Sequence, residues 1–346
     1  MDRRIRFALQ ASVFLALTLG GGGWAVYRGG VIPEDLEPLF HLPTLSVALL
    51  VVLSLGLYIS DAWRYRTAGH ALDVEVPWSA AAHASIACNF FSCITPGASL
   101  GAPAAIVMLG RRGIGWEAST LISFGKSTIG SVLLLIAAFI ALATGMGPAL
   151  PKGITQILAW GTGLSSLVVI GTIIAASRPG RVVAALHALD ERLQESHGKE
   201  HWGTRVIRRL AAGVVESVER LRAFKPTRVP AIIASQVIYF GCFIGLAVVL
   251  GEALGANPSP ELWGVSTVYV AFLYVAPTPG GAGLAEGAAT DFFGALLAPA
   301  AAVMTVLLFR ALTFYLYVAV GLVHVGWVGG LGAMMAEADA ETARRL

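Results

Sequence analysis

The chain has 346 residues, of which 56% are hydrophobic and only 13% are charged, and its mean hydropathy is +0.73. Soluble domains carry about 25% charged residues, so this composition excludes a disordered chain, a disulfide-rich secreted scaffold and a nucleic-acid-binding domain. Together with a net charge of only +3, it indicates an all-α polytopic integral membrane protein.

Six stretches are long and apolar enough to cross a bilayer, which takes about 20 residues per helix. They are residues 7–27, 43–60, 116–144, 154–177, 229–250 and 299–323. The first stretch is followed by further spans, so we interpret it as an uncleaved anchor and not as a signal peptide.

Two further apolar stretches, 78–110 and 261–298, are interrupted in the middle, the first at 95–97 and the second at 277–281. Proline removes a backbone donor and glycine frees the chain to turn. We predict that each stretch forms a re-entrant hairpin that turns near mid-membrane. The alternative is two full spans, but these would move two clusters of basic residues to the opposite side.

The distribution of basic residues predicts the direction of the spans, because cytoplasmic loops collect Lys and Arg. With the N-terminus inside, twenty of the 24 basic residues fall on the cytoplasmic side, including Arg64, and only Arg28 and Lys152 fall outside. The remaining two, Lys126 and Arg310, lie within predicted spans. We therefore expect both termini in the cytoplasm.

Segment 178–228 is the one sizeable polar region, with eleven basic and six acidic residues. The apolar residues Leu210, Val214, Val218 and Leu221 recur at helical spacing within it, which predicts an amphipathic helix. A cytoplasmic helix lying against anionic lipid is favoured over a partner-binding site.

The two interrupted stretches occupy similar positions in two larger units, 43–144 and 229–323. Each unit consists of a span, an interrupted stretch and a second span, and both contain Thr-Pro-Gly. The first unit starts outside the membrane and the second inside. This pattern predicts an inverted-topology repeat within a single membrane domain, a plan that recurs in secondary transporters.

The turns of the predicted hairpins are candidate anion sites. A helix that begins at mid-membrane, near Ser99 or Gly283, would point free N–H groups into the membrane centre with a partial positive charge. The alternative is a purely structural kink. The turn residues of the candidate site are Thr95, Gly97, Ser99, Thr278, Gly280, Gly281 and Gly283.

Lys126 and Arg310 are the most informative polar residues, because a charge at the bilayer centre costs roughly 3 kcal/mol or more and usually faces a cavity. Each lies about ten residues into the span that follows an interrupted stretch. Glu286 falls in the first turn of the second return arm, where it would lock onto Arg310 or titrate beside an anion. Asn89, in the first hairpin, completes the candidate set.

Catalytic and cofactor motifs are absent from the sequence. It contains no HExxH, no Gly-x-Ser-x-Gly, no P-loop and no acidic metal pair in the predicted outer loops. We therefore expect neither an enzyme nor a bound metal or organic cofactor. The three cysteines lie in apolar stretches without CxxC spacing and are interpreted as core residues.

Several runs together resemble the transmembrane-region family of lysylphosphatidylglycerol synthase: 63–66, 89–91, 95–97 and 277–286. The resemblance covers about residues 5–325. It implies a flippase-like domain of the bacterial cytoplasmic membrane without the soluble synthase domain. It also implies a separate lipid-modifying enzyme as a candidate partner.

We therefore expect a protein that moves an anionic phospholipid or a lipid-linked phosphate between leaflets. Lys126, Arg310 and the helix N-termini would hold the phosphate, and Glu286 would balance the charge. A secondary transporter of a small soluble anion and a noncatalytic scaffold are the alternatives. The expected partners are the anionic substrate, the surrounding lipids and a second copy of the chain, and no nucleic acid.

Overall fold

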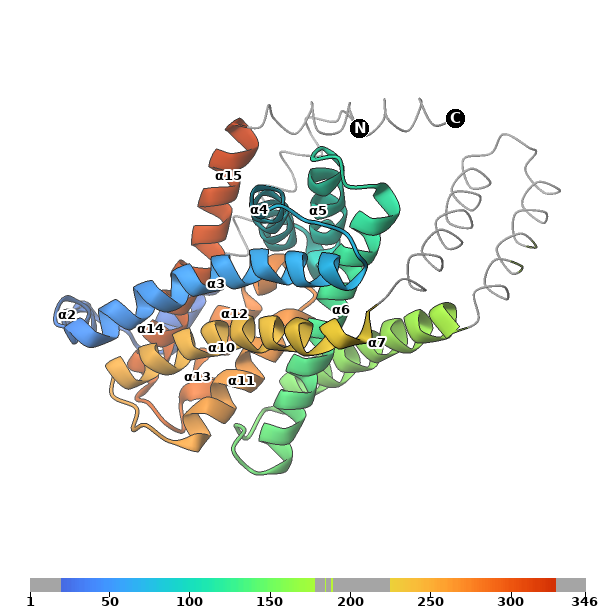
Figure 1. The fold of residues 1–346 in the computed structure, drawn as a ribbon. Helices are drawn as coiled ribbons and strands as arrows, with labels where there is room; N and C mark the ends of the chain where they lie inside the picture. The colour runs from blue at the N-terminus through green and yellow to red at the C-terminus, as the bar shows by residue number, and fades with distance from the viewer. Residues whose placement is uncertain (1–19, 178–183, 185–187, 189–224, 328–346) are drawn as a thin grey trace, which may run out of the picture.

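The structure, a computed structural model, describes residues 20–177, 184, 188 and 225–327, and every regular element in these residues is a helix (Figure 1). Four helices are long and apolar enough to cross a membrane: Thr44–Ala71, Trp116–Ala143, Pro226–Ala253 and Pro299–His324. The prediction of an all-α, multi-pass membrane protein is therefore confirmed.

The predicted spans correspond to helices of the structure. They are α3 (Thr44–Ala71), α6 (Trp116–Ala143), α7 (Lys152–Ser177), α10 (Val229–Ala253), and α14 (Pro299–Arg310), which continues through a π-helical turn (Ala311–Tyr315) into α15 (Leu316–Trp327). Of the predicted first span, residues 20–28 are helical, and the rest lies outside the described residues. The predicted amphipathic helix of 178–228 also falls almost wholly outside them.

Helix α3 continues to Ala71, beyond its predicted end at residue 60. Asp61 and Arg64 end the apolar run in the sequence, but both are buried within the protein and form an ion pair. Buried charges are tolerated when they are paired, so the helix continues through them. The structure therefore places Arg64 within the helix, and the prediction that it lies in a segment after the span is wrong.

Helices α3 and α10 run antiparallel and side by side across the molecule (Figure 1). Lys225, just before α10, donates its Nζ to Asp73, just after α3, at 2.6 Å. The hydrogen bond and charge of Lys225 lower the pKa of the Asp73 carboxyl. The C-terminal end of α3 and the N-terminal end of α10 therefore lie at the same face.

The first interrupted stretch forms α4 (Trp78–Ile94) and α5 (Gly101–Gly110), which pack against each other. The helix ends at Ile94 because the residue before a proline avoids helical geometry, and Thr95 is extended. A 3₁₀ turn, Pro96–Ala98, separates the two helices. The predicted interruption of the apolar stretch at 95–97 is thus confirmed.

The second interrupted stretch differs from the expected single return helix. Its elements are α11 (Pro260–Val275), the 3₁₀ turn Pro279–Gly281, α12 (Leu284–Gly287) and α13 (Ala289–Phe293). Gly283, with a φ of 80°, precedes α12, and the return arm is interrupted at Ala288, between α12 and α13. Glycine adopts a positive φ without a steric penalty.

The two Thr-Pro-Gly turns have matching conformations and contact each other. Gly97 has φ 57° and ψ 27°, and Gly280 has φ 53° and ψ 22°. The next residues, Ala98 and Gly281, also have positive φ, at 55° and 75°. Two segments 183 positions apart in the chain therefore form the same local structure at one place in the fold.

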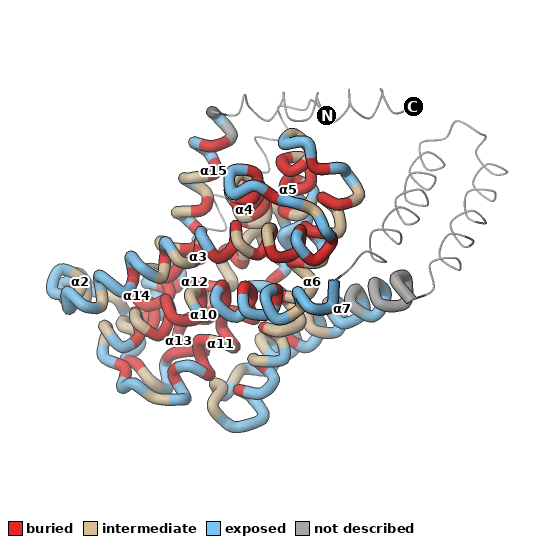
Figure 2. The backbone as a smooth tube through the Cα atoms, in the orientation of Figure 1, coloured by how far each residue is buried: buried red, intermediate tan, exposed pale blue. Residues whose placement is uncertain are grey.

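Burial follows the contacts between helices, and the outer faces are exposed and apolar (Figure 2). Aromatic side chains fill the core around α11, α13 and α14, where the Tyr269 ring lies edge-on to Phe292 and Phe309. Alanines dominate the contact of α4 with α5, because small residues let membrane helices approach closely. Residues such as Phe139 and Trp160 point outward, as expected for a lipid-facing surface.

Candidate functional site

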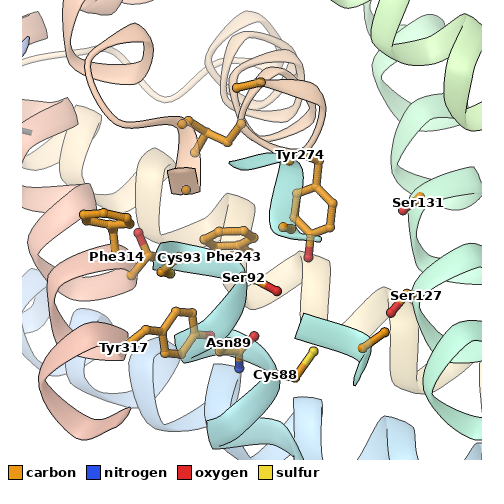
Figure 3. Close-up of a pocket in the computed structure, with 18 of the residues that line it drawn as sticks. Cys88, Asn89, Ser92, Cys93, Ser127, Ser131, Phe243, Tyr274, Phe314 and Tyr317 are labelled. Atoms are coloured by element: carbon orange, nitrogen blue, oxygen red, sulfur yellow. The ribbon is translucent and has the colours of Figure 1, made fainter. Parts of the chain in front are cut away.

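A cavity of about 410 Å³ lies where the two Thr-Pro-Gly turns meet. Figure 3 shows Ser127 and Ser131 of α6 on one side of it and Phe314 and Tyr317 on the other. Residues of α4, among them Asn89, lie between them. Three basic side chains line the cavity as well: Arg64, Lys126 and Arg310.

Arg310 stands at the end of α14 and is only 2% exposed. Its Nε donates to Glu286 Oε1 at 2.8 Å and its Nη1 to the carbonyl of Gly280 at 2.7 Å. The guanidinium also lies over the ring of Phe314, 3.8 Å from its centroid. Its Nη2 is buried without a hydrogen-bond partner, so Arg310 keeps one donor nitrogen that is unpaired.

Glu286 occupies the helix start near Gly283, where the sequence predicts an anion site. Its Oε2 accepts the N–H of Gly283 at 2.8 Å, and α12, which begins there, has only four residues. The prediction of a free anion-binding N-terminus at Gly283 is therefore wrong, because the chain's own carboxylate fills it. Glu286 has no exposed surface, and of the two alternatives for this residue the structure contains the ion pair with Arg310.

Lys126 is paired with Asp61, a residue that the sequence analysis did not single out. Lys126 Nζ lies 2.7 Å from Asp61 Oδ1, and Arg64 Nη1 lies 2.9 Å from the same oxygen. Asp61 also accepts hydrogen bonds from Ser85 and Asn89. Asp61 and Arg64 are three positions apart, which is pairing distance on a helix, and this spacing was the signal that could have revealed the pair.

Arg64 is held by its surroundings on several sides. Its guanidinium lies 4.1 Å from the centroid of the Tyr239 ring, and its Nη2 donates to the carbonyl of Lys126 at 3.4 Å. Gly130 makes this approach feasible, because a Cβ there would lie 2.5 Å from Arg64 Nη2 and 2.7 Å from Gln236 Oε1. The Arg64 Nε has no hydrogen-bond partner.

The structure separates the predicted turn residues into two groups. Those that line the cavity are Gly97, Ser99, Thr278, Gly280 and Gly281, and Asn89 lines it as well. Thr95 caps the turn instead, because its hydroxyl donates to the Phe91 carbonyl at 2.6 Å and accepts from the Leu100 N–H at 3.3 Å. Ser99 precedes α5, which begins only at Gly101.

The charges of the cluster do not cancel. Among the described residues that are buried, the carboxylates are Asp61 and Glu286, and the permanently basic groups are Arg64, Lys126 and Arg310. With all five ionised, the cluster carries one net positive charge. The excess lies around Asp61, because this one carboxylate pairs with both Lys126 and Arg64. No carboxylate of the described chain lines the cavity, and no group of three His, Cys, Asp or Glu residues there could hold a metal ion.

Comparison with known families agrees with this membrane fold. The family model described as "Lysylphosphatidylglycerol synthase TM region" matches residues 14–321. The chain belongs to this family. A search of curated proteins returned no match. The resemblance seen in the sequence is thereby confirmed, and the match is to the transmembrane region of the synthase family.

Proposed function

We propose that this member of the lysylphosphatidylglycerol synthase transmembrane-region family moves a phosphate-bearing lipid between the leaflets of the bacterial cytoplasmic membrane. The observation that carries the proposal is the cavity, which is lined by three buried basic side chains at the contact of two broken helices. Irregular backbone and charge are expensive at membrane depth unless they line a polar cavity. A lipid phosphate supplies the anion that such a cavity needs.

The arrangement of helix ends supports re-entrant hairpins in an inverted repeat. The Nε of Arg66, near the end of α3, donates to the carbonyl of Val76 just before α4 at 3.1 Å. The start of α4 therefore lies at the same face as the end of α3. Near the start of α11, Gly264 lies against the carbonyl of Met146, which follows the C-terminal end of α6. These contacts favour stretches that start from opposite faces, with turns that contact each other between those faces.

A lipid substrate is favoured over a small soluble anion because the cavity wall continues to the outer surface of the protein. Phe124 lines the cavity from α6 and is 51% exposed, and Tyr274 lines it from α11 and is 39% exposed. α6 is one of the apolar candidate spans, so this surface faces lipid in the proposed orientation. A headgroup could enter there while its acyl chains stay in the bilayer.

The test is a scrambling assay with the full chain in vesicles that contain phosphatidylglycerol with a fluorescent acyl chain. Dithionite quenches label in the outer leaflet, so protein-dependent movement appears as loss of the protected half of the signal. We expect that loss with the wild type and a clear decrease with Arg310→Met. Gly125→Ala, on α6 with open space at the new Cβ, is the control and should act as wild type.

Two other results would overturn the proposal. Uptake of radiolabelled phosphate into the vesicle lumen without movement of the labelled lipid would identify a soluble-anion transporter. Absence of both activities, with folded protein confirmed by its thermal transition, would leave the scaffold function.

A further inference from the structure

We infer that the cavity selects a headgroup that carries one negative charge and otherwise only uncharged hydroxyl groups, and that it rejects headgroups with an ammonium group. This inference rests on the proposed function and deepens it, because it names the class of lipid. The family description mentions a lysylated lipid, whose headgroup carries ammonium groups. A cavity that rejects ammonium groups would differ from a site that binds that headgroup.

The first argument is the absence of any acidic partner for an ammonium group. Asp61 and Glu286 have no exposed surface and are bound to Lys126, Arg64 and Arg310. Within the described part of the chain, the charged groups of the cavity wall are therefore all cations. An ammonium group entering the cavity would meet like charges at short range, and such juxtaposition costs several kcal/mol.

The second argument is the size of the uncompensated charge. The single net positive charge of the buried cluster matches one phosphodiester. The Arg64 Nε and the Arg310 Nη2 are buried without hydrogen-bond partners, so each is a candidate donor to its oxygens. Charge-assisted hydrogen bonds of this kind are the strong ones. The surplus lies beside Lys126 and Arg64, since Glu286 neutralises Arg310.

The third argument concerns the other polar groups of the wall, which are uncharged and lie among apolar and aromatic residues. Thr278 and Tyr317 line the cavity, and their hydroxyls are buried without a hydrogen-bond partner. Ser92 and Ser131 line it as well (Figure 3). A hydroxyl can both donate and accept, so these groups suit the hydroxyls of a glycerol or sugar headgroup.

The experiment compares three lipids with the same fluorescent acyl chain in the scrambling assay: phosphatidylglycerol, phosphatidylethanolamine and lysylphosphatidylglycerol. We expect phosphatidylglycerol to move at least about tenfold faster than either lipid with an ammonium group, a ratio that corresponds to about 1.4 kcal/mol. Equal rates for all three would overturn the charge selection and leave the proposed function standing. Movement of none would overturn the proposed function itself.

Two variants test whether the net charge carries the preference. Lys126→Met brings the cluster to zero net charge while Asp61 keeps Arg64, Ser85 and Asn89 as partners, and we expect it to lose most of the tenfold preference. Asp61→Asn combined with Lys126→Met removes the pair and keeps the net charge of +1, so the preference should persist. A double variant that loses the preference as Lys126→Met does would overturn the charge argument, provided that its thermal transition shows folded protein.

Discussion

At the scale of single residues, Asp61 is the side chain on which the buried cluster depends. It accepts hydrogen bonds from Lys126, Arg64, Ser85 and Asn89 while it is wholly buried. Removing one partner of a buried ion pair costs more than removing both, because the remaining charge is left without compensation. Asp61 therefore joins α3, α4 and α6 into one unit.

We expect Asp61→Asn to lower the free energy of unfolding by about 3–5 kcal/mol, since it leaves two buried cations close together. Combining it with Lys126→Met should restore a large part of that loss. The measurement is thermal unfolding in detergent, followed by intrinsic fluorescence. A double variant that is less stable than Asp61→Asn alone would show that Lys126 stabilises the fold without reference to Asp61.

Glu286 is the candidate coupling group, because a phosphate would compete with its carboxylate for Arg310, 2.8 Å away. A neutral side chain at position 286 would leave Arg310 free for the phosphate, so we expect any pH dependence of lipid movement to require this carboxylate. Glu286→Gln should keep or strengthen movement of phosphatidylglycerol and make it independent of pH. An unchanged pH profile in this variant, recorded from vesicles at several pH values, would rule out Glu286 as the coupling group.

At the scale of elements, the two turns show how the same backbone is built from different residues. Both need two successive residues with positive φ, and the second turn uses Gly280 and Gly281. The first uses Gly97 and then Ala98, whose Cβ is strained in this conformation. The first turn therefore stores strain that the second avoids.

We predict that Ala98→Gly stabilises the protein by about 1 kcal/mol, because glycine adopts a positive φ without the steric cost of a Cβ. The matched variant is Gly281→Ala, which should destabilise by a similar amount, since its new Cβ would also lie 3.2 Å from Leu273. Both values come from thermal unfolding in the same detergent. A loss of stability in Ala98→Gly together with a gain in Gly281→Ala would contradict the shared turn conformation.

At the scale of the whole molecule, the contacts define two faces. The ends of α3 and α10 that meet through Lys225 and Asp73 lie at one face. At the other, Arg28 forms an ion pair with Asp291 at 3.3 Å, and Gly29 lies against Pro299, the first residue of α14. Asp291 is thereby engaged away from the residues that line the cavity.

The topology prediction assigns the first face to the cytoplasm. Single cysteines at 70 and 112 should react with a membrane-impermeant maleimide only from the cytoplasmic side. Cysteines at 257 and 298 should react only from outside, and all four positions are exposed. The native Cys88, Cys93 and Cys242 are replaced by serine or alanine in the background used. Labelling of 112 from the outer side would exclude the first re-entrant hairpin.

The sequence by itself determined the membrane class, the positions of the long helices, the two interrupted stretches and the placement of Lys126 and Arg310 within spans. Hydropathy, proline and glycine act locally and are read from neighbouring residues, so these predictions required no tertiary contact. The pairing of Glu286 with Arg310 was also within reach, because both follow the same turn.

Only the tertiary structure decided which charges meet. Asp61 and Lys126 are 65 positions apart. The sequence predicts Arg64 in a segment after the span, whereas the structure buries it within α3. The fate of the Gly283 N–H likewise depended on the orientation of the Glu286 side chain. Whether a charge ends a membrane helix or lies within it depends on partners supplied by other helices, and a linear pattern of hydropathy carries no record of them.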